Sequence, residues 1–296
     1  MDSRLLDFLA RAEQVLERIE PMLPALRPQV DWNQCVAARW VRDGRSGYLL
    51  PLDVSLDLSL SDLLGIDAQR EQLARNTRQF VSGMPANHAL LWGARGTGKS
   101  SLVRALLAEH AQAGLRLVEI ERDHLADLPR LVELLAGLPQ RFVLFCDDLS
   151  FEAGEGDYRV LKSVLDGSLE QAPDNVLLYA TSNRRHLVPE HQSDNENWKR
   201  VDGELHPNEA VEDKIALSDR FGLWLSFYPF SQDHFLIVVR HWVDVQARQA
   251  GLNWRWDEAL EKAAIRWALG RGNRNGRCAY QFARHWVGLQ LLEQQA

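Results

Sequence analysis

Residues 89–107 read Ala89-Leu-Leu-Trp-Gly-Ala-Arg-Gly-Thr-Gly-Lys-Ser-Ser-Leu-Val-Arg-Ala-Leu-Leu107. The apolar run from Ala89 to Trp92 predicts a short buried strand. Three glycines follow within a few residues, and they predict a turn with backbone angles that a side chain would forbid. From Lys99 onward the apolar residues recur at helical spacing. We therefore expect a strand, a glycine-rich loop and a helix in direct succession.

This loop fits the pattern G-x-x-x-x-G-K-[ST] of the phosphate-binding P-loop, in the strand–loop–helix context that the motif requires. Loop amides and a helix N-terminus together attract phosphate. Lys99 is expected to contact the β- and γ-phosphates, and the Ser100 hydroxyl to ligate Mg²⁺. An ordinary glycine-rich turn is the alternative, but the flanking strand and helix favour nucleotide binding. The expected nucleotide-binding residues of the loop are Gly93, Ala94, Arg95, Gly96, Thr97, Gly98, Lys99, Ser100 and Ser101.

Composition is typical of a globular protein of about two domains, with 296 residues, 46% hydrophobic and 25% charged. No apolar run of about 18 residues exists, so no membrane span is expected. The first residues do not resemble a signal peptide. The three scattered cysteines lack metal-ligand spacing and predict free thiols in a cytoplasmic protein. The net charge of −7 argues against nucleic-acid binding by the whole surface.

The middle of the chain alternates between expected strands and expected helices. Such alternation predicts an α/β fold with a parallel sheet covered on both faces. The expected strands are 89–92, 115–120, 141–146, 175–180 and 222–228, and the main expected helices between them are 99–107, 128–138 and 158–170.

The two ends of the chain differ from the middle. Residues 1–60 predict a helix over 3–20 and a β-hairpin from Cys35 to Pro51, whereas residues 231–296 predict helices only. We therefore expect an N-terminal α+β prefix (1–60), a nucleotide-binding core (61–230) and a helical lid (231–296). Within the core, segment 184–219 is polar and acidic, and it predicts either a partner contact or a solvated insertion.

Two carboxylates end the apolar strand Phe142-Val-Leu-Phe-Cys-Asp-Asp148. In a P-loop protein, Asp147 is expected to hold Mg²⁺ and Asp148 to act as general base on the attacking water. The alternative is a turn or helix N-cap, in which Asp is common. The position of this strand, about 50 residues after the P-loop, favours the catalytic interpretation.

Further polar residues follow other expected strands or helices. Asn183 ends the segment Asn175–Asn183, where it is expected either to contact the γ-phosphate or to form a turn. Arg220 precedes the last strand as a surface ion-pair residue or as an arginine finger. Either Arg274 or Arg277 is expected to contact phosphate from the start of the last helix, since an arginine there is otherwise unfavourable.

These motifs together resemble the AAA+ ATPases. Gly93–Ser100 resembles Walker A, Phe142–Asp148 resembles Walker B, Asn183 resembles sensor 1, Arg220 the arginine finger, and Arg277 sensor 2; Leu64, Gly65 and Ile66 lie in a segment similar to the one that lines the adenine pocket. Over about residues 30–290 the chain is also similar to a bacterial family of predicted P-loop ATPases, domain of unknown function 815. Two of the similar sequence segments are Phe145-Cys-Asp-Asp-Leu-Ser-Phe151 and Arg220-Phe-Gly-Leu-Trp-Leu-Ser-Phe-Tyr-Pro-Phe230.

The resemblance implies a five-stranded αβα core, a helical lid and a homo-oligomeric ring or partial ring, in which Arg220 acts in the neighbour's site. Asp148 stands where most AAA+ proteins have Glu, and its shorter side chain predicts slow hydrolysis. The segment Glu121-Arg-Asp-His-Leu-Ala126 lacks the aromatic–hydrophobic–Gly motif of AAA+ rings that thread proteins through their centre. An unfoldase function is therefore not expected.

Three functions remain open from the sequence. The first is a Mg²⁺-dependent ATPase that remodels or loads an unidentified protein partner. The second is a nucleotide-gated switch or loader with very slow turnover. The third is a nucleic-acid-binding motor, because basic residues alternate with tryptophans after Gly251; core packing of these tryptophans is the preferred interpretation. The expected cofactors are ATP and Mg²⁺.

Overall fold

The computed structural model describes residues 11, 13, 29–44, 46–150, 160–162, 165, 173–183, 199–201, 204–206 and 220–295. The helix expected over 3–20 lies almost entirely outside these residues, as does most of the acidic segment 184–219. Two short strands are described within that segment, β7 (Lys199–Val201) and β8 (Glu204–His206), and they pair antiparallel with each other.

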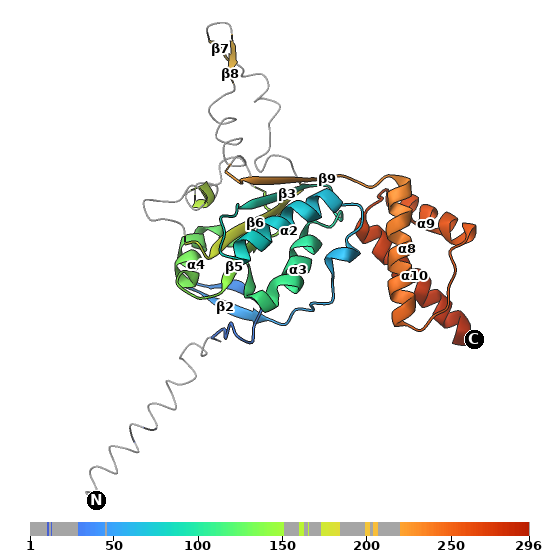
Figure 1. Ribbon diagram of the computed structural model, residues 1–296, viewed down its shortest axis with the longest axis horizontal. Helices are drawn as coiled ribbons and strands as arrows, with labels where there is room; N and C mark the ends of the chain where they lie inside the picture. Colours follow the sequence, from blue (N-terminus) through green and yellow to red (C-terminus); the bar gives the residue numbers. More distant parts are fainter. Residues whose placement is uncertain are drawn as a thin grey trace, which may run out of the picture.

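A seven-stranded sheet forms the centre of the molecule, in the order β2-β1-β4-β5-β6-β3-β9 (Figure 1). All neighbouring strands are parallel except β1 and β2. The strands are β1 (Ala37–Asp43), β2 (Ser46–Leu52), β3 (Ala89–Gly93), β4 (Leu115–Glu119), β5 (Arg141–Cys146), β6 (Val176–Ser182) and β9 (Leu223–Phe227).

The expectation of a five-stranded sheet is wrong, because the N-terminal hairpin joins the sheet. Strand β1 pairs with β4 from Ala37 opposite Leu117 to Arg39 opposite Glu119, and an ion pair of 2.8 Å links these last two side chains. The hairpin itself was expected from the alternating pattern. Its docking onto β4 depends on which strand edge is open, and the local pattern does not contain that information.

Helices cover both faces of the sheet, as the strand–helix alternation predicts. Adjacent residues of β3 show the two layers, because Leu90 packs with the core on one face and Leu91 with the core on the other. Helices α2 (Asp67–Val81) and α3 (Lys99–His110) cover the face of Leu91, and α4 (Leu128–Leu135) covers the face of Leu90. The P-loop therefore follows a strand whose first three residues, Ala89 to Leu91, are buried.

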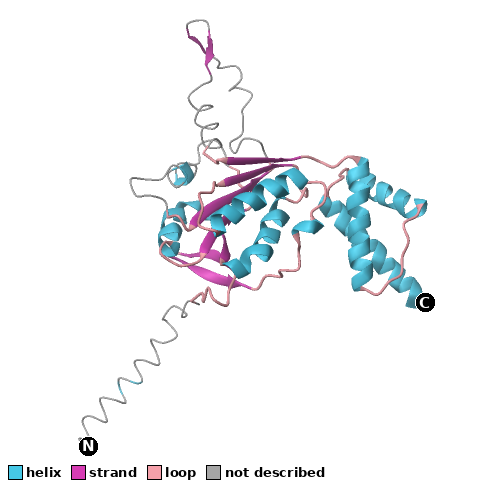
Figure 2. Ribbon diagram, viewed as in Figure 1, coloured by secondary structure: helices cyan, strands magenta, loops and turns pink. Residues whose placement is uncertain are grey.

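The C-terminal region is helical, as expected, and lies beside the sheet (Figure 2). It consists of α8 (Gln232–Gln249), α9 (Glu258–Arg271) and α10 (Gly276–Gln295). Its tryptophans pack on one another, with ring centroids 6.4 Å apart for Trp254 and Trp256 and 6.2 Å apart for Trp254 and Trp286. We call this region the lid; the domain boundaries at residues 60 and 230 stay predictions.

Short 3-10 helices connect these elements: η2 (Leu60–Asp62), η3 (Ala111–Ala113) and η4 (Arg122–Asp127). Helix η2 contacts the lid, because Asp62 Oδ1 lies 3.1 Å from His241 Nε2 of α8. Among the described residues, no helix is both long enough and apolar enough to cross a membrane.

Candidate nucleotide-binding site

The glycine-rich loop between β3 and α3 has the backbone that its sequence predicts. Gly93, Gly96 and Gly98 all have positive φ, of 131°, 76° and 106°. Gly93 also lies against the edge strand, and a Cβ there would come within 2.0 Å of the Phe227 carbonyl oxygen. Only glycine fits this position, where the sheet ends and the loop turns into the helix.

Lys99 is buried under the loop at the start of α3. Its Nζ donates to the carbonyl oxygens of Gly93 and Ala94, both at 2.7 Å, and to Asn183 Oδ1 at 3.4 Å. Burial lowers the pKa of the Lys99 ammonium, whereas the charges of Asp147 and Asp148 oppose that change. The ammonium is thus held within the loop, next to the two carboxylates.

Ser100 and Asp147 meet at the carboxyl edge of the sheet. The Ser100 hydroxyl donates to Asp147 Oδ1 at 2.7 Å, and the Thr181 hydroxyl at the end of β6 donates to the same oxygen at 2.5 Å. These side chains come from three segments that are separate in sequence: α3, the end of β5 and β6. The contact places one hydroxyl and one carboxylate side by side, as expected for the predicted Mg²⁺ ligands.

Asp148 is held from both sides. Among the described residues it is the one non-glycine residue with positive φ, at 56°, and its amide donates to Thr181 Oγ1 at 2.9 Å. Its Oδ1 accepts a hydrogen bond from Asn183 Nδ2, and its Oδ2 lies 3.6 Å from Arg95 Nη2. The structure therefore brings the predicted general base and the predicted sensor 1 residue into direct contact.

The lid touches the tip of the P-loop. Asn275 Nδ2 donates to the Arg95 carbonyl oxygen at 2.8 Å, and the Arg277 amide donates to the Gly96 carbonyl oxygen at 3.1 Å. Arg277 lies close enough to Lys99 to lower its pKa further. Arg274 contacts the core through its carbonyl oxygen, which accepts from the Phe230 amide at 2.9 Å. Of the two arginines considered as sensor 2, Arg277 is the one whose backbone contacts the P-loop.

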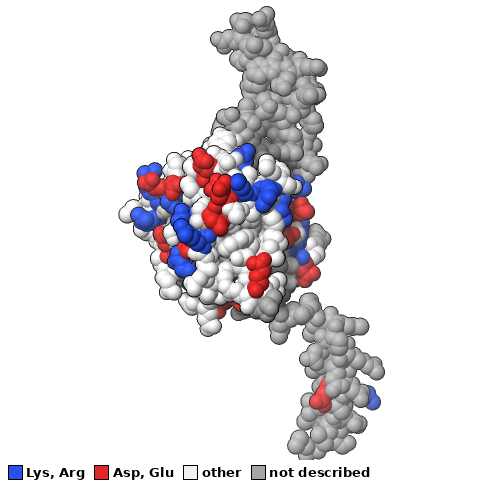
Figure 3. Space-filling model, turned by 90° about the vertical axis from the view of Figure 1, so that its right-hand side faces the viewer, with Lys and Arg blue, Asp and Glu red and all other residues white. Residues whose placement is uncertain are grey.

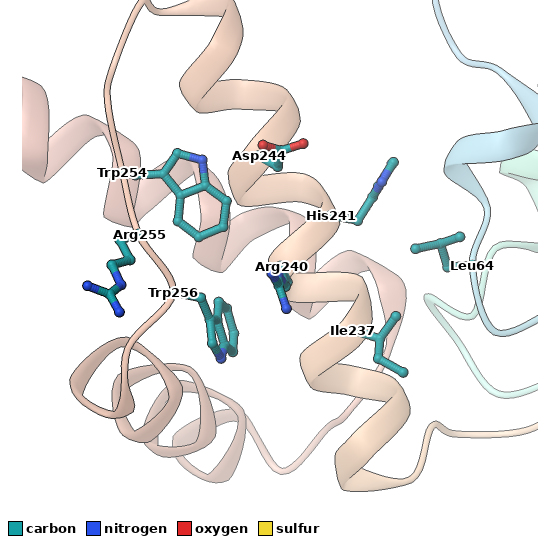
Figure 4. A pocket seen from close by; sticks show the side chains of 8 residues that line it. All are labelled: Leu64, Ile237, Arg240, His241, Asp244, Trp254, Arg255 and Trp256. Carbon is teal, nitrogen blue, oxygen red and sulfur yellow. The ribbon is translucent and has the colours of Figure 1, made fainter.

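The predicted adenine segment lies between the P-loop and the lid. Ile66 is buried, and its Cδ1 lies 3.3 Å from the position of a Cβ on Gly98; Gly65 packs against the Phe230 ring. Leu64 faces a pocket of about 560 Å³, across from Ile237 and His241 of α8 (Figure 4). The complete lining is Leu64, Ile237, Arg240, His241, Asp244, Trp254, Arg255 and Trp256.

Arg220 is not part of this cluster. It precedes β9, whose first residue Leu223 pairs with Ala89 and whose last residue Phe227 pairs with Gly93. A parallel strand of this length spans about 13 Å. Arg220 therefore lies at the amino edge of the sheet, opposite the edge that carries the P-loop of the same chain.

Magnesium fits the oxygen atoms at the carboxyl edge. Within the described ranges, no group of three or more His, Cys, Asp or Glu side chains is placed to hold a metal ion. Mg²⁺ usually takes only one or two protein ligands and completes its octahedron with water and phosphate oxygens. Ser100 and Asp147 match that requirement, whereas a Zn²⁺ or Ca²⁺ site would need more protein ligands.

Two contacting residues were missed in the sequence. Thr181 lies within the segment Asn175–Asn183, and its hydroxyl contacts Asp147 and Asp148; its place two residues before Asn183 in that segment could have indicated this. The sequence prediction names Arg274 and Arg277 but not Asn275. Its Oδ1 accepts from the Cys278 amide at 2.8 Å, and an Asn just before a helical pattern is a recognisable capping signal.

Solved structures with a similar fold include RuvB and Orc1, which are AAA+ ATPases. A RuvB variant from Thermotoga maritima is 15% identical, with a TM-score of 0.50 over 77% of this chain and 63% of that one. A second RuvB variant is 14% identical, with a TM-score of 0.53 over 80% and 67%. Aeropyrum pernix Orc1, in a complex with DNA, is 16% identical, with a TM-score of 0.53 over 80% and 65%.

The chain thus spans less than two thirds of the length of the first RuvB structure. None of the curated proteins matches the chain in sequence. A family profile does match, over residues 33–290, which include the hairpin, the P-loop, both carboxylates and most of the lid. The chain therefore belongs to the family described as Protein of unknown function (DUF815), and its fold is that of the AAA+ ATPases.

Proposed function

We propose that this protein is a Mg²⁺-dependent ATPase that uses its lid to remodel or load a protein partner. One observation carries the proposal: hydrogen bonds through Thr181 join two groups, Lys99–Asn183–Asp148 and Ser100–Asp147, into one cluster at the carboxyl edge of the sheet. Ligands of open α/β sheets bind at this edge. The cluster contains a cation for phosphate, oxygen ligands for magnesium and a carboxylate for activating water.

Each residue has a separate task in this proposal. The loop amides and the Lys99 ammonium bind the phosphates, and Ser100 and Asp147 would hold Mg²⁺. Bound Mg²⁺ neutralises charge on the phosphate oxygens. Asp148 accepts the proton of the attacking water, and Asn183 orients Asp148. Leu64, Gly65 and Ile66 form the floor of the adenine site, and Ile237 and His241 of α8 form its lid side.

We expect hydrolysis to be slow. Asp148 is a short side chain, and hydrogen bonds fix both its backbone and one carboxylate oxygen. A base that cannot adjust toward the water forfeits part of the rate gained from alignment. Turnover well below the usual 1–10³ s⁻¹ is the expected result.

The active form is expected to be a homo-oligomer. Arg220 lies at the edge of the sheet opposite its own P-loop, so it can act as an arginine finger only in a neighbouring subunit. An arginine supplied in this way contributes about 10³–10⁵ to the turnover of phosphoryl transfer. A complete site would therefore require two subunits, and activity per subunit would rise with protein concentration.

Steady-state ATP hydrolysis by the wild type and by Asp148→Asn tests the proposal. The amide keeps the shape of the side chain but cannot accept the proton, so we expect turnover to fall at least 100-fold while ATP still binds. Asp233→Asn is the control, because it removes a carboxylate that is also exposed but lies in the first turn of α8. Equal turnover in Asp148→Asn and the wild type would contradict the assignment of the base.

A nucleotide-gated switch or loader is the second candidate, and the direct contact between Asn275 and the P-loop favours it. In a switch, ATP binding alone would move the lid, and turnover would lie near 10⁻² s⁻¹ or below, the order of magnitude of switch GTPases. Amide hydrogen exchange in α10 separates the two candidates. A switch predicts the same ATP-dependent change in Asp148→Asn as in the wild type.

The described surface gives little support to a nucleic-acid motor. Acidic and basic side chains are interspersed on the side of the molecule that carries the lid (Figure 3). Trp254, Trp256, Trp267 and Trp286 are partly buried and pack against the core cluster. Stacking on bases requires exposed aromatic faces along a basic groove. Core packing therefore accounts for these tryptophans.

A further inference from the structure

We propose that Arg95 restrains Asp148, and that Asn275 of the lid holds Arg95 in the restraining position. The lid would thereby regulate the rate of ATP hydrolysis. This inference rests on the proposed function, in which Asp148 is the general base. It adds Arg95 as a regulatory positioning residue. Removal of Arg95 should raise turnover, whereas removal of a catalytic arginine would lower it.

The first observation is the environment of the Asp148 carboxylate. Oδ1 accepts a hydrogen bond from Asn183, and Oδ2 lies 3.6 Å from Arg95 Nη2. A general base needs a free lone pair directed at the attacking water. Oδ1 thus has a hydrogen-bond donor and Oδ2 has a guanidinium beside it, so both oxygens interact with protein groups that would compete with the attacking water.

The second observation is the position of Arg95 itself. It belongs to the tip of the P-loop, between Ala94, whose amide donates to the Phe227 carbonyl oxygen at 3.0 Å, and Gly96. Its guanidinium is therefore carried by the same loop that would receive the phosphates.

The third observation is the link from Arg95 to the lid. Asn275 Nδ2 donates to the Arg95 carbonyl oxygen at 2.8 Å, while Asn275 Oδ1 caps α10 by accepting from the Cys278 amide. The fit is close, because a Cβ on Gly96 would lie 2.7 Å from Asn275 Nδ2. One side chain thus joins the first turn of α10 to the residue that faces the base.

These contacts form a continuous chain from the lid through Asn275, Arg95 and Asp148 to Asn183. If the lid turns away from the core, Asn275 leaves the Arg95 carbonyl and the loop tip loses its anchor. The ion pair is exposed, with 76% of the Arg95 side chain and 58% of the Asp148 side chain accessible. An exposed pair is weak, so the restraint is reversible and worth at most about five-fold in rate.

Turnover at saturating ATP tests the inference. Arg95→Ala should raise kcat about two- to five-fold, because the guanidinium no longer attracts Oδ2 of the base away from the attacking water. Arg75→Ala is the matched control, since Arg75 is exposed on α2 and has no ion pair among the described residues. Added salt should raise kcat of the wild type by screening the pair, and should not raise kcat of Arg95→Ala.

Asn275→Ser separates the link to the loop from the helix cap. Serine caps a helix about as well as asparagine, but its hydroxyl is too short to reach the Arg95 carbonyl. We expect Asn275→Ser to raise kcat as Arg95→Ala does, and the double variant to be no faster than Arg95→Ala alone. Asn273→Ser is the control, because Asn273 donates to the Arg271 carbonyl and not to the P-loop.

The two levels of the proposal fail in different ways. The absence of hydrolysis by the wild type and by every variant would contradict the proposed function and the inference with it. Full hydrolysis by Asp148→Asn would contradict them as well. If Asp148→Asn is inactive and Arg95→Ala has a kcat equal to or below that of the wild type, the site assignment stands and the inference is overturned. Additive gains in the double variant would show that Asn275 does not act through Arg95.

Discussion

Thr181→Val probes the group that holds both carboxylates in place. Thr181 is buried at the end of β6, where its hydroxyl donates to Asp147 and accepts from the Asp148 amide. Valine has nearly the same shape but no hydroxyl. The Asp148 amide is then left without its acceptor, which costs about 1–3 kcal/mol, and Asp147 keeps only the Ser100 hydroxyl of its two hydroxyl donors.

We therefore expect Thr181→Val to lower the free energy of unfolding by about 2–3 kcal/mol, measured as a lower urea midpoint with an unchanged slope. ATP hydrolysis should fall as well, because Asp147 and Asp148 lose their common anchor. Thr181→Ser is the control: it keeps the hydroxyl and removes one buried methyl group, at a cost of about 1 kcal/mol. Equal stability of the two variants, together with full hydrolysis by Thr181→Val, would refute this reasoning.

Other parts of the fold give further predictions. His88 accepts from the Leu178 amide through Nδ1, and burial lowers its pKa to about 4 from 6.5; this stabilisation is present above pH 6.5 and is lost as the pH falls toward 4. Between pH 7.5 and pH 5, the free energy of unfolding measured in urea should fall by about 2 kcal/mol in the wild type and by less in His88→Gln; an equal fall in the two proteins would exclude His88 as its source. Arg220→Ala should reduce specific ATPase activity about 1,000-fold and abolish its rise with protein concentration, whereas unchanged activity would argue for a site within one subunit. Gly93→Ala should lower stability by about 3 kcal/mol in thermal melts, because its Cβ would meet the Phe227 carbonyl; a wild-type melting temperature would contradict the close approach.

The sequence alone predicts the strand–loop–helix unit and the polar residues that follow neighbouring strands. Gly93 to Ser100 form a local motif whose geometry depends on adjacent residues only. Asp147 and Asn183 end two separate strands, and parallel strands bring their carboxyl ends to one edge. The fold class therefore predicts that Asn183 and Asp148 lie near each other, but it does not predict the hydrogen bond between their side chains.

Contacts between distant elements could not be predicted in the same way. The hairpin was predicted, but its pairing with β4 added strands to an expected five-stranded sheet. The contact of Asn275 with Arg95 depends on how the lid meets the core, and residues 180 positions apart leave no periodic signal. The positive φ of Asp148 is a further example, because it accompanies tertiary hydrogen bonds from the amides of Asp148 and Leu149 to Thr181.

The most direct test of the central claim is the affinity for Mg²⁺-ATP, measured by titration calorimetry on the wild type and on Lys99→Ala. The Lys99 ammonium is buried in the loop and donates to two of its carbonyl oxygens, so it is positioned to bind phosphate there. A charged hydrogen bond of 1.5–3 kcal/mol predicts affinity about 10- to 150-fold weaker in Lys99→Ala. Equal affinity of the two proteins, or no binding by the wild type, would contradict the assignment of this loop as an ATP site.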